Sequence, residues 1–148
     1  MAFRSSFVCG LFALWLVGCV GCGETSDVAQ VTGVVKLGDE PLEFIHVEFW
    51  PENGQRAFGK TDAQGRFELQ TDDRKFVGAS PGTNRVVLKD TWHMKDDYID
   101  GGGDWVDMSK GRKSRIHSKY MDALKTPLTA VVKPGEANEF EFVAEPRG

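Results

Sequence analysis

The chain has 148 residues, of which 27% are charged and 41% hydrophobic, and its formal net charge is −4. A chain of this length suits one domain and leaves little room for a second. The ordinary composition excludes wholesale disorder, and the mild acidic balance argues against nucleic acid as a partner, because nucleic-acid binders carry a basic face. Three cysteines cannot form a closed disulfide framework.

The first 18 residues have the pattern of an export signal. Arg4 is the only charge before an uncharged, mostly apolar run from Phe7 to Gly18. A helix of that length spans about 18 Å, well short of a bilayer core of about 30 Å, which disfavours the alternative of a short transmembrane anchor. We therefore expect residues 1–18 to be a signal peptide.

The sequence LVGC at residues 16–19 resembles the lipobox of bacterial lipoproteins. This resemblance implies that Cys19 is lipidated, with palmitate among its acyl chains, and becomes the first residue of the mature protein. Cys22 also follows a glycine, but only Cys19 has an aliphatic residue at the third place before it. Residues 19–30 would then form a lipidated tether to a bacterial membrane, with the protein facing the periplasm or the cell exterior. Ordinary cleavage that releases a secreted domain is the alternative.

Residues 31–144 predict an all-β sandwich of about seven strands. The alternation of side chains is clearest in residues 42–52 (LEFIHVEFWPE), where Ile45, Val47 and Phe49 share one face. Pairs such as Asn53-Gly54 and Pro134-Gly135 supply turns between strands. The expected strands are 31–37, 42–52, 55–61, 67–69, 84–88, 127–132 and 138–143. The candidate core residues are Ile45, Val47, Phe49, Phe67, Leu69, Val86, Leu88, Phe140 and Phe142.

Several segments together resemble bacterial lipoproteins that carry a carboxypeptidase-regulatory-like, or transthyretin-like, domain. These segments are VTGVVKLGDEPLEFIHVEFWPENG, TDAQGRFEL, PGTNRVVL and KYMDALKTPLTAVVKPGEANEFEF, within residues 31–89 and 117–143. The resemblance implies a seven-stranded immunoglobulin-like or prealbumin-like sandwich of the cell envelope. In related proteins this module accompanies enzymes or receptors without doing chemistry itself, so the resemblance implies no particular ligand.

The residues themselves also argue against an enzyme. The three histidines, His46, His93 and His117, show no metal-ligand spacing, and no serine has the context of a nucleophile elbow. The enzymatic transthyretin-like group, the hydroxyisourate hydrolases, ends in a Tyr-Arg-Gly-Ser type tail, whereas this sequence ends in Glu-Pro-Arg-Gly. We therefore expect no catalytic residues, although a hydrolase in which His46 takes part stays a distant alternative.

The connection at residues 90–116 departs from the family pattern by its length. Its acidic half, residues 90–109, holds six aspartates and one lysine, whereas residues 110–119 hold five basic residues and no acidic one. The acidic half could bind Ca²⁺ through Asp100, Asp104 and Asp107, because calcium accepts many oxygen ligands in irregular loops.

Two other interpretations of this connection stay open. It could recognise a glycan or an envelope protein through its aromatic side chains, which are Trp92, Tyr98 and Trp105. It could instead be a solvated, self-complementary loop that its aromatics pin to the sandwich. We expect a lipid-anchored, non-enzymatic binding or structural module of the envelope, with a calcium- or carbohydrate-binding module as the alternative.

Overall fold

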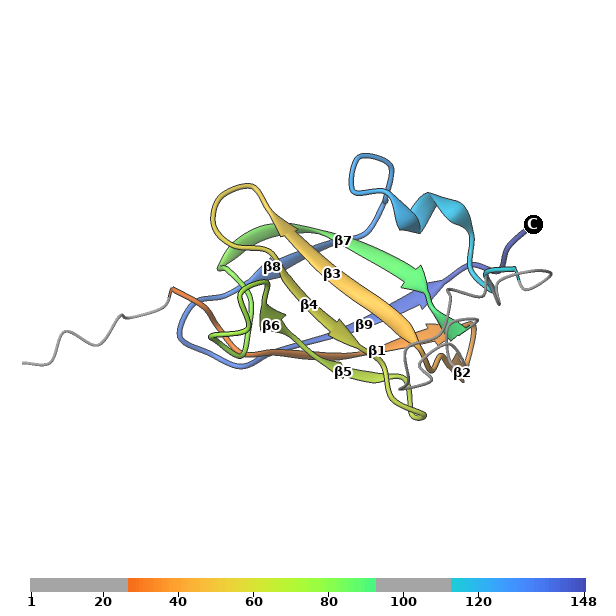
Figure 1. The fold of residues 1–148 in the computed structure, drawn as a ribbon, viewed down its shortest axis with the longest axis horizontal. Coiled ribbons are helices and arrows are strands. Elements are labelled where there is room, and N and C mark those ends of the chain that lie inside the picture. Colours follow the sequence, from red (N-terminus) through yellow and green to blue (C-terminus); the bar gives the residue numbers. More distant parts are fainter. Residues whose placement is uncertain (1–26, 93–112) are drawn as a thin grey trace, which may run out of the picture.

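The first sheet is built around β1 (Val31–Leu37) in a computed structural model that describes residues 27–92 and 113–148 (Figure 1). β9 (Asn138–Ala144) runs parallel to β1 along its whole length. β5 (Arg66–Glu68) and the two-residue β2 (Glu40–Pro41) pair antiparallel with successive stretches of β1. The first and last strands of the described chain therefore lie side by side.

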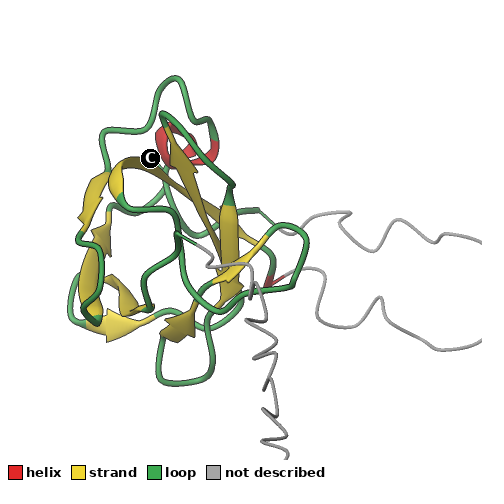
Figure 2. Cartoon of the chain, turned by 90° about the vertical axis from the view of Figure 1, so that its left-hand side faces the viewer, coloured by secondary structure: helices red, strands yellow, loops and turns green. Residues whose placement is uncertain are grey.

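The second sheet has the order β6-β4-β3-β7-β8 and is antiparallel throughout. Its centre is the long pair of β3 (Ile45–Pro51) and β7 (Gly82–Asp90). The flanking strands are β4 (Ala57–Lys60), β6 (Gln70–Thr71) and β8 (Thr129–Val132). A short 3-10 helix, η2 (Ser118–Met121), packs near β7 before the chain reaches β8. Figure 2 shows the two sheets enclosing the interior.

The core lies between the sheets and is made by the residues that alternate inward. In β3, Ile45, Val47 and Phe49 are fully buried, whereas the residues between them are only partly buried. Phe49 packs against Phe140 and Phe142 of the opposite sheet, with ring centroids 5.8 and 6.1 Å apart. The other expected core positions are buried as well, and Phe140 is partly so. The prediction of an all-β sandwich is confirmed.

All seven expected strands form with bounds that differ by up to three residues, and the largest difference is at the start of β3. The segment 42–52 becomes β3 only from Ile45, because Phe44 has a φ of 65° and breaks the alternation. Leu42 instead donates its amide to the carbonyl of Val35 in the first sheet, at 2.9 Å. The extended strand therefore begins only after Phe44, whose ring centroid lies 4.7 Å from Lys60 Nζ of the neighbouring strand. The short strands β2 and β6 were not expected.

The sandwich has two distinct ends. Ala29 and Ala79 exchange backbone hydrogen bonds of 3.0 Å just before β1 and β7 begin, so both strands start at one end. Nine residues of β7 then span about 30 Å to Asp90 at the opposite end. In Figure 1 the described chain starts on the left, and β7 points to the right. No helix within the described ranges is long and apolar enough to cross a membrane.

Candidate functional site

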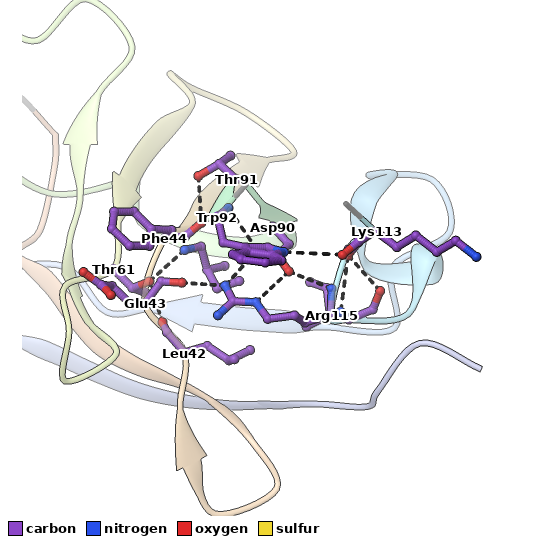
Figure 3. A network of polar contacts seen from close by, with 12 residues as sticks. Leu42, Glu43, Phe44, Thr61, Asp90, Thr91, Trp92, Lys113 and Arg115 are labelled. Atoms are coloured by element: carbon purple, nitrogen blue, oxygen red, sulfur yellow. Dashed lines mark hydrogen bonds and ion pairs between the residues drawn. The ribbon is translucent and has the colours of Figure 1, made fainter. Parts of the chain in front are cut away.

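The roots of the 90–116 connection are held together by a clasp between Asp90 and Arg115 (Figure 3). The Arg115 guanidinium donates to both Asp90 carboxylate oxygens, from Nε at 2.9 Å and from Nη2 at 2.8 Å. The backbone amide of Arg115 adds a third bond of 2.7 Å to the same carboxylate. Nη2 also donates to the carbonyl of Glu43 at 2.6 Å, which ties the clasp to the turn before β3.

The two side chains of the clasp differ in their exposure to solvent. The Asp90 side chain is fully buried, whereas 30% of the Arg115 side chain is exposed. Burial alone would raise the pKa of Asp90, but the bonds from Arg115 and from the Trp92 amide outweigh it and hold this pKa below its usual value. The carboxylate is therefore charged in the folded protein, and its charge depends on Arg115.

Trp92 is the one predicted contact residue that lies in the described chain, and it belongs to this clasp. Its amide donates to Asp90 at 3.2 Å, its indole Nε1 donates to the carbonyl of Lys113 at 3.4 Å, and the Arg115 guanidinium lies 5.6 Å from its ring. The acidic half and the basic half of the connection thus meet at its root, next to an aromatic side chain. Its contact with a partner stays a prediction.

The remaining predicted site residues lie outside the described residues. They are Cys19, the proposed calcium ligands Asp100, Asp104 and Asp107, and the aromatic residues Tyr98 and Trp105. Within residues 27–92 and 113–148, no three His, Cys, Asp or Glu side chains lie close enough together to hold a metal ion. The calcium site and the lipidation site therefore stay predictions.

A second polar cluster lies on the outer face of β3, around Glu48. Its carboxylate accepts from Lys89 Nζ at 2.6 Å and from Trp50 Nε1 at 2.9 Å, and His46 Nε2 lies 3.3 Å away. The bond from His46, followed by those from Lys89 and Trp50, lowers the pKa of Glu48 to about 2 although the group is partly buried. Glu48 is thus an anion at neutral pH, with three neighbouring side chains in contact with its carboxylate.

His46 belongs to this cluster on the outer face of β3. His46 is one-third exposed and stacks on Phe58 with ring centroids 5.6 Å apart. The depression that it lines with Glu48 and Trp50 has a volume of only ≈ 60 Å³. Pockets for organic ligands typically measure about 300–1,000 Å³, so this depression is large enough for a few water molecules and too small for such a ligand.

A larger pocket of ≈ 380 Å³ lies beside the clasp, at the end of the sandwich opposite Ala29. It mixes apolar and hydrogen-bonding groups and is lined by Ser114, Ile116, His117, Ser118, Met121, Arg147 and Gly148. Its walls are held in place by the last residues of the chain, because the amide of His117 bonds to the Glu145 carbonyl and the amide of Arg147 to the Arg115 carbonyl, each at 3.0 Å. Its volume lies within the range of small-molecule pockets.

The pocket brings a histidine and an arginine together, and the partners of its imidazole and hydroxyl groups are as follows. Nucleophilic catalysis needs a base in hydrogen-bond contact with the nucleophile. In the described chain the His117 side chain bonds to the Lys119 amide, at 3.0 Å, and to neither Ser114 nor Ser118. The hydroxyl of Ser114 bonds instead to the Ile116 carbonyl at 3.0 Å.

Sequence reasoning did not single out Arg115, Glu48 or Arg147. A signal existed for the first, since Asp90 and Arg115 carry opposite charges at the two ends of one long connection. Arg147 carried no local signal, because its position beside His117 arises from contacts between distant segments.

Comparisons of the chain with protein-family models, with curated proteins and with solved structures find no match.

Proposed function

We propose that this protein is a lipid-anchored, non-enzymatic binding module of the bacterial cell envelope. The observation that carries the proposal is the separation of the two ends of the sandwich. The described chain begins beside the Ala29–Ala79 bridge, whereas the clasp and the ≈ 380 Å³ pocket lie at the far end of β7. The far end is the end that would contact a ligand or an envelope partner.

The distances make this arrangement workable. Residues 19–26 can extend at most about 28 Å from a lipidated Cys19 to the start of the domain. The sandwich adds about 30 Å between its two ends, judged from the nine residues of β7. Several acyl chains would make the attachment durable, since a single chain binds a membrane only marginally.

The all-β sandwich supports the proposal, which also rests on a resemblance of the sequence. Lipoproteins with a carboxypeptidase-regulatory-like, or transthyretin-like, domain would have a two-sheet β body behind a lipobox. Support for a binding rather than a catalytic role comes from the bonded state of Glu48 and His46 and from the pairing of His117 with a backbone amide. A carbohydrate or a protein is the expected partner, and calcium binding by the 90–116 connection is kept as the alternative.

Lipidation is tested by growing bacteria that express the full chain with radiolabelled palmitate. Label is expected in the wild type and in Cys22→Ser, and its absence is expected in Cys19→Ser. The membrane fraction should contain the first two proteins and lose the third. Unlabelled wild-type protein, or label that survives in Cys19→Ser, would contradict the anchor at this position.

Binding is tested by a pull-down from solubilised envelopes with the purified lipoprotein as bait. Trp92→Ala and Trp105→Ala should reduce recovery of a specific partner if the 90–116 connection makes the contact. Recovery that is equal for the wild type and both variants would exclude these two side chains from the contact. A calcium-dependent rise in melting temperature, lost in Asp104→Asn, would favour the alternative function.

A further inference from the structure

We propose that the ≈ 380 Å³ pocket at the far end of the sandwich binds the carboxylate of an organic acid that also carries an apolar group. The pocket combines unpaired hydrogen-bond donors with an apolar wall, next to the clasp. This inference rests on the proposed binding function and adds to it a ligand class. It does not depend on lipidation at residue 19.

The first donor is the Nε2 atom of His117. The Nδ1 atom of this ring accepts the backbone amide of Lys119 at 3.0 Å, so Nδ1 carries no proton in this arrangement. The proton of a neutral imidazole must then be on Nε2, which makes Nε2 a donor. No described residue accepts a hydrogen bond from it.

Arg147 and Ser118 supply the other donors. Neither side chain has a hydrogen-bond or ion-pair partner among the residues that the structure describes, and both line the pocket. A guanidinium presents its N–H groups in a planar fork that matches the two oxygens of a carboxylate. A guanidinium, an imidazole N–H and a hydroxyl together form a donor set suited to an oxyanion.

Two acidic side chains close to the pocket, Glu145 and Asp90, are already paired with basic side chains. Glu145 Oε2 lies 2.7 Å from Lys119 Nζ, and this bond holds the pKa of Glu145 below its usual value. Asp90 is neutralised in the same way by Arg115, whose guanidinium it binds through both oxygens. Arg147 therefore has no competing side-chain carboxylate among its described neighbours.

The apolar wall selects the other part of the ligand. Met121 is partly buried and packs against the core, and Ile116 is fully buried beneath the pocket. A methionine adapts its shape to an apolar group more readily than a branched residue does. The pocket therefore favours a carboxylate that carries a hydrocarbon group over a small inorganic anion.

The test is a calorimetric titration of the full-length, detergent-solubilised protein with N-acetylleucine and with its neutral analogue N-acetylleucinamide. The acid should bind, and the amide should bind at least tenfold more weakly, because hydrogen bonds to a charged group contribute more than those to a neutral one. Equal affinity for both compounds, or no detectable binding of the acid, would overturn the inference.

Three variants identify the donors. Arg147→Gln should weaken binding of N-acetylleucine by about tenfold or more. His117→Asn keeps an acceptor for the Lys119 amide but removes the Nε2 donor, so it should weaken binding severalfold while the melting temperature stays within a few degrees. Lys133→Gln, at the opposite end of the sandwich, is the matched control and should bind like the wild type. Wild-type affinity in Arg147→Gln would show that the carboxylate does not bind here.

A second titration distinguishes a peptide C-terminus from a free organic acid as the source of the carboxylate. A short peptide that ends in leucine with a free carboxylate should bind more tightly than N-acetylleucine if the natural ligand is a peptide C-terminus, and equally if it is a free organic acid. If no carboxylate binds to the protein but palmitate is still incorporated, the inferred ligand is wrong and the proposed lipid-anchored module is unaffected. If a carboxylate binds but no palmitate is incorporated, only the proposed lipid anchor is contradicted.

Discussion

Asp90 and Arg115 lie 25 residues apart in the sequence and are joined by three hydrogen bonds of 2.7 to 2.9 Å. The carboxylate is the last residue of β7, and the guanidinium follows the 93–112 segment. Because Arg115 also bonds to the Glu43 carbonyl, one side chain connects both roots of the connection to the sandwich. The clasp thereby positions the pocket that begins at Ser114.

Arg115→Met should destabilise the protein by about 3 kcal/mol, because removing one partner of a buried ion pair leaves a buried charge uncompensated. The fully buried Asp90 would lose its only ion-pair partner in the described chain. Urea denaturation at pH 7 measures the change in the free energy of unfolding.

Lys36→Met is the matched control for this prediction. Lys36 pairs with Glu141 at 2.6 Å, but the Glu141 side chain is 57% exposed. Exposed pairs contribute about 0–1 kcal/mol, so this variant should lose little stability. Equal losses in the two variants would mean that the burial of Asp90 has no energetic consequence.

The stability of the protein should depend on pH through Glu48. Its pKa is about 2 in the folded protein and near 4.5 without these contacts, so folding favours the charged form. The stabilisation is therefore present above pH 4.5 and is lost as the pH falls towards 2, with a maximum of about 3 kcal/mol. Asp90, whose pKa is also lowered, should add to the loss with the same sign.

Glu48→Gln should flatten this pH profile. The variant is expected to be less stable than the wild type at pH 7 and to approach the wild type near pH 2, where Glu48 itself becomes protonated. The exposed Glu139→Gln on β9 is the control and should follow the wild type throughout. A constant difference between Glu48→Gln and the wild type from pH 7 to pH 2 would exclude a titration of Glu48 as the cause.

Thr61→Val should lower the free energy of unfolding by about 2–3 kcal/mol, although valine has nearly the same shape as threonine. The buried Thr61 hydroxyl accepts the Ile45 amide at 2.8 Å and donates to the Leu42 carbonyl at 2.6 Å (Figure 3). Valine would leave both backbone groups without this partner, and each unsatisfied buried group costs about 1–3 kcal/mol. Thr61→Ser keeps the hydroxyl, so it should retain most of the stability in the same urea titration.

Gly33→Ala should destabilise the sandwich by about 1–3 kcal/mol through overpacking. Gly33 lies in β1 between Phe67 and Phe140 on the neighbouring strands. A methyl group there would lie 2.7 Å from the Phe67 ring and would overlap the Phe140 carbonyl oxygen. Gly38→Asn is the control, because the space around Gly38 is open and asparagine tolerates its φ of 61°. Thermal melting that ranks the two variants in the opposite order would contradict this packing.

Local pattern predicted the strands well because alternation is a property of neighbours in the chain. The burial of Ile45, Val47 and Phe49 follows from period-two geometry alone. The same rule failed at Phe44, where a positive φ allows the chain to pass from one sheet to the other. Nothing in the local pattern at Phe44 signals that change, since it is set by the hydrogen bonds of Leu42 and Thr61 with distant residues.

The sequence by itself determined an all-β chain and the inward side of most strands, because both depend on residues close together in the chain. Only the tertiary structure decided that β9 pairs with β1, that Arg115 neutralises Asp90 and that Arg147 lies beside His117. Side-chain alternation specifies which face is buried but not which strand becomes the neighbour. Whether a side chain in a site is charged, and whether its hydrogen-bond donors are free, depends on its burial and on the partners that distant segments bring next to it.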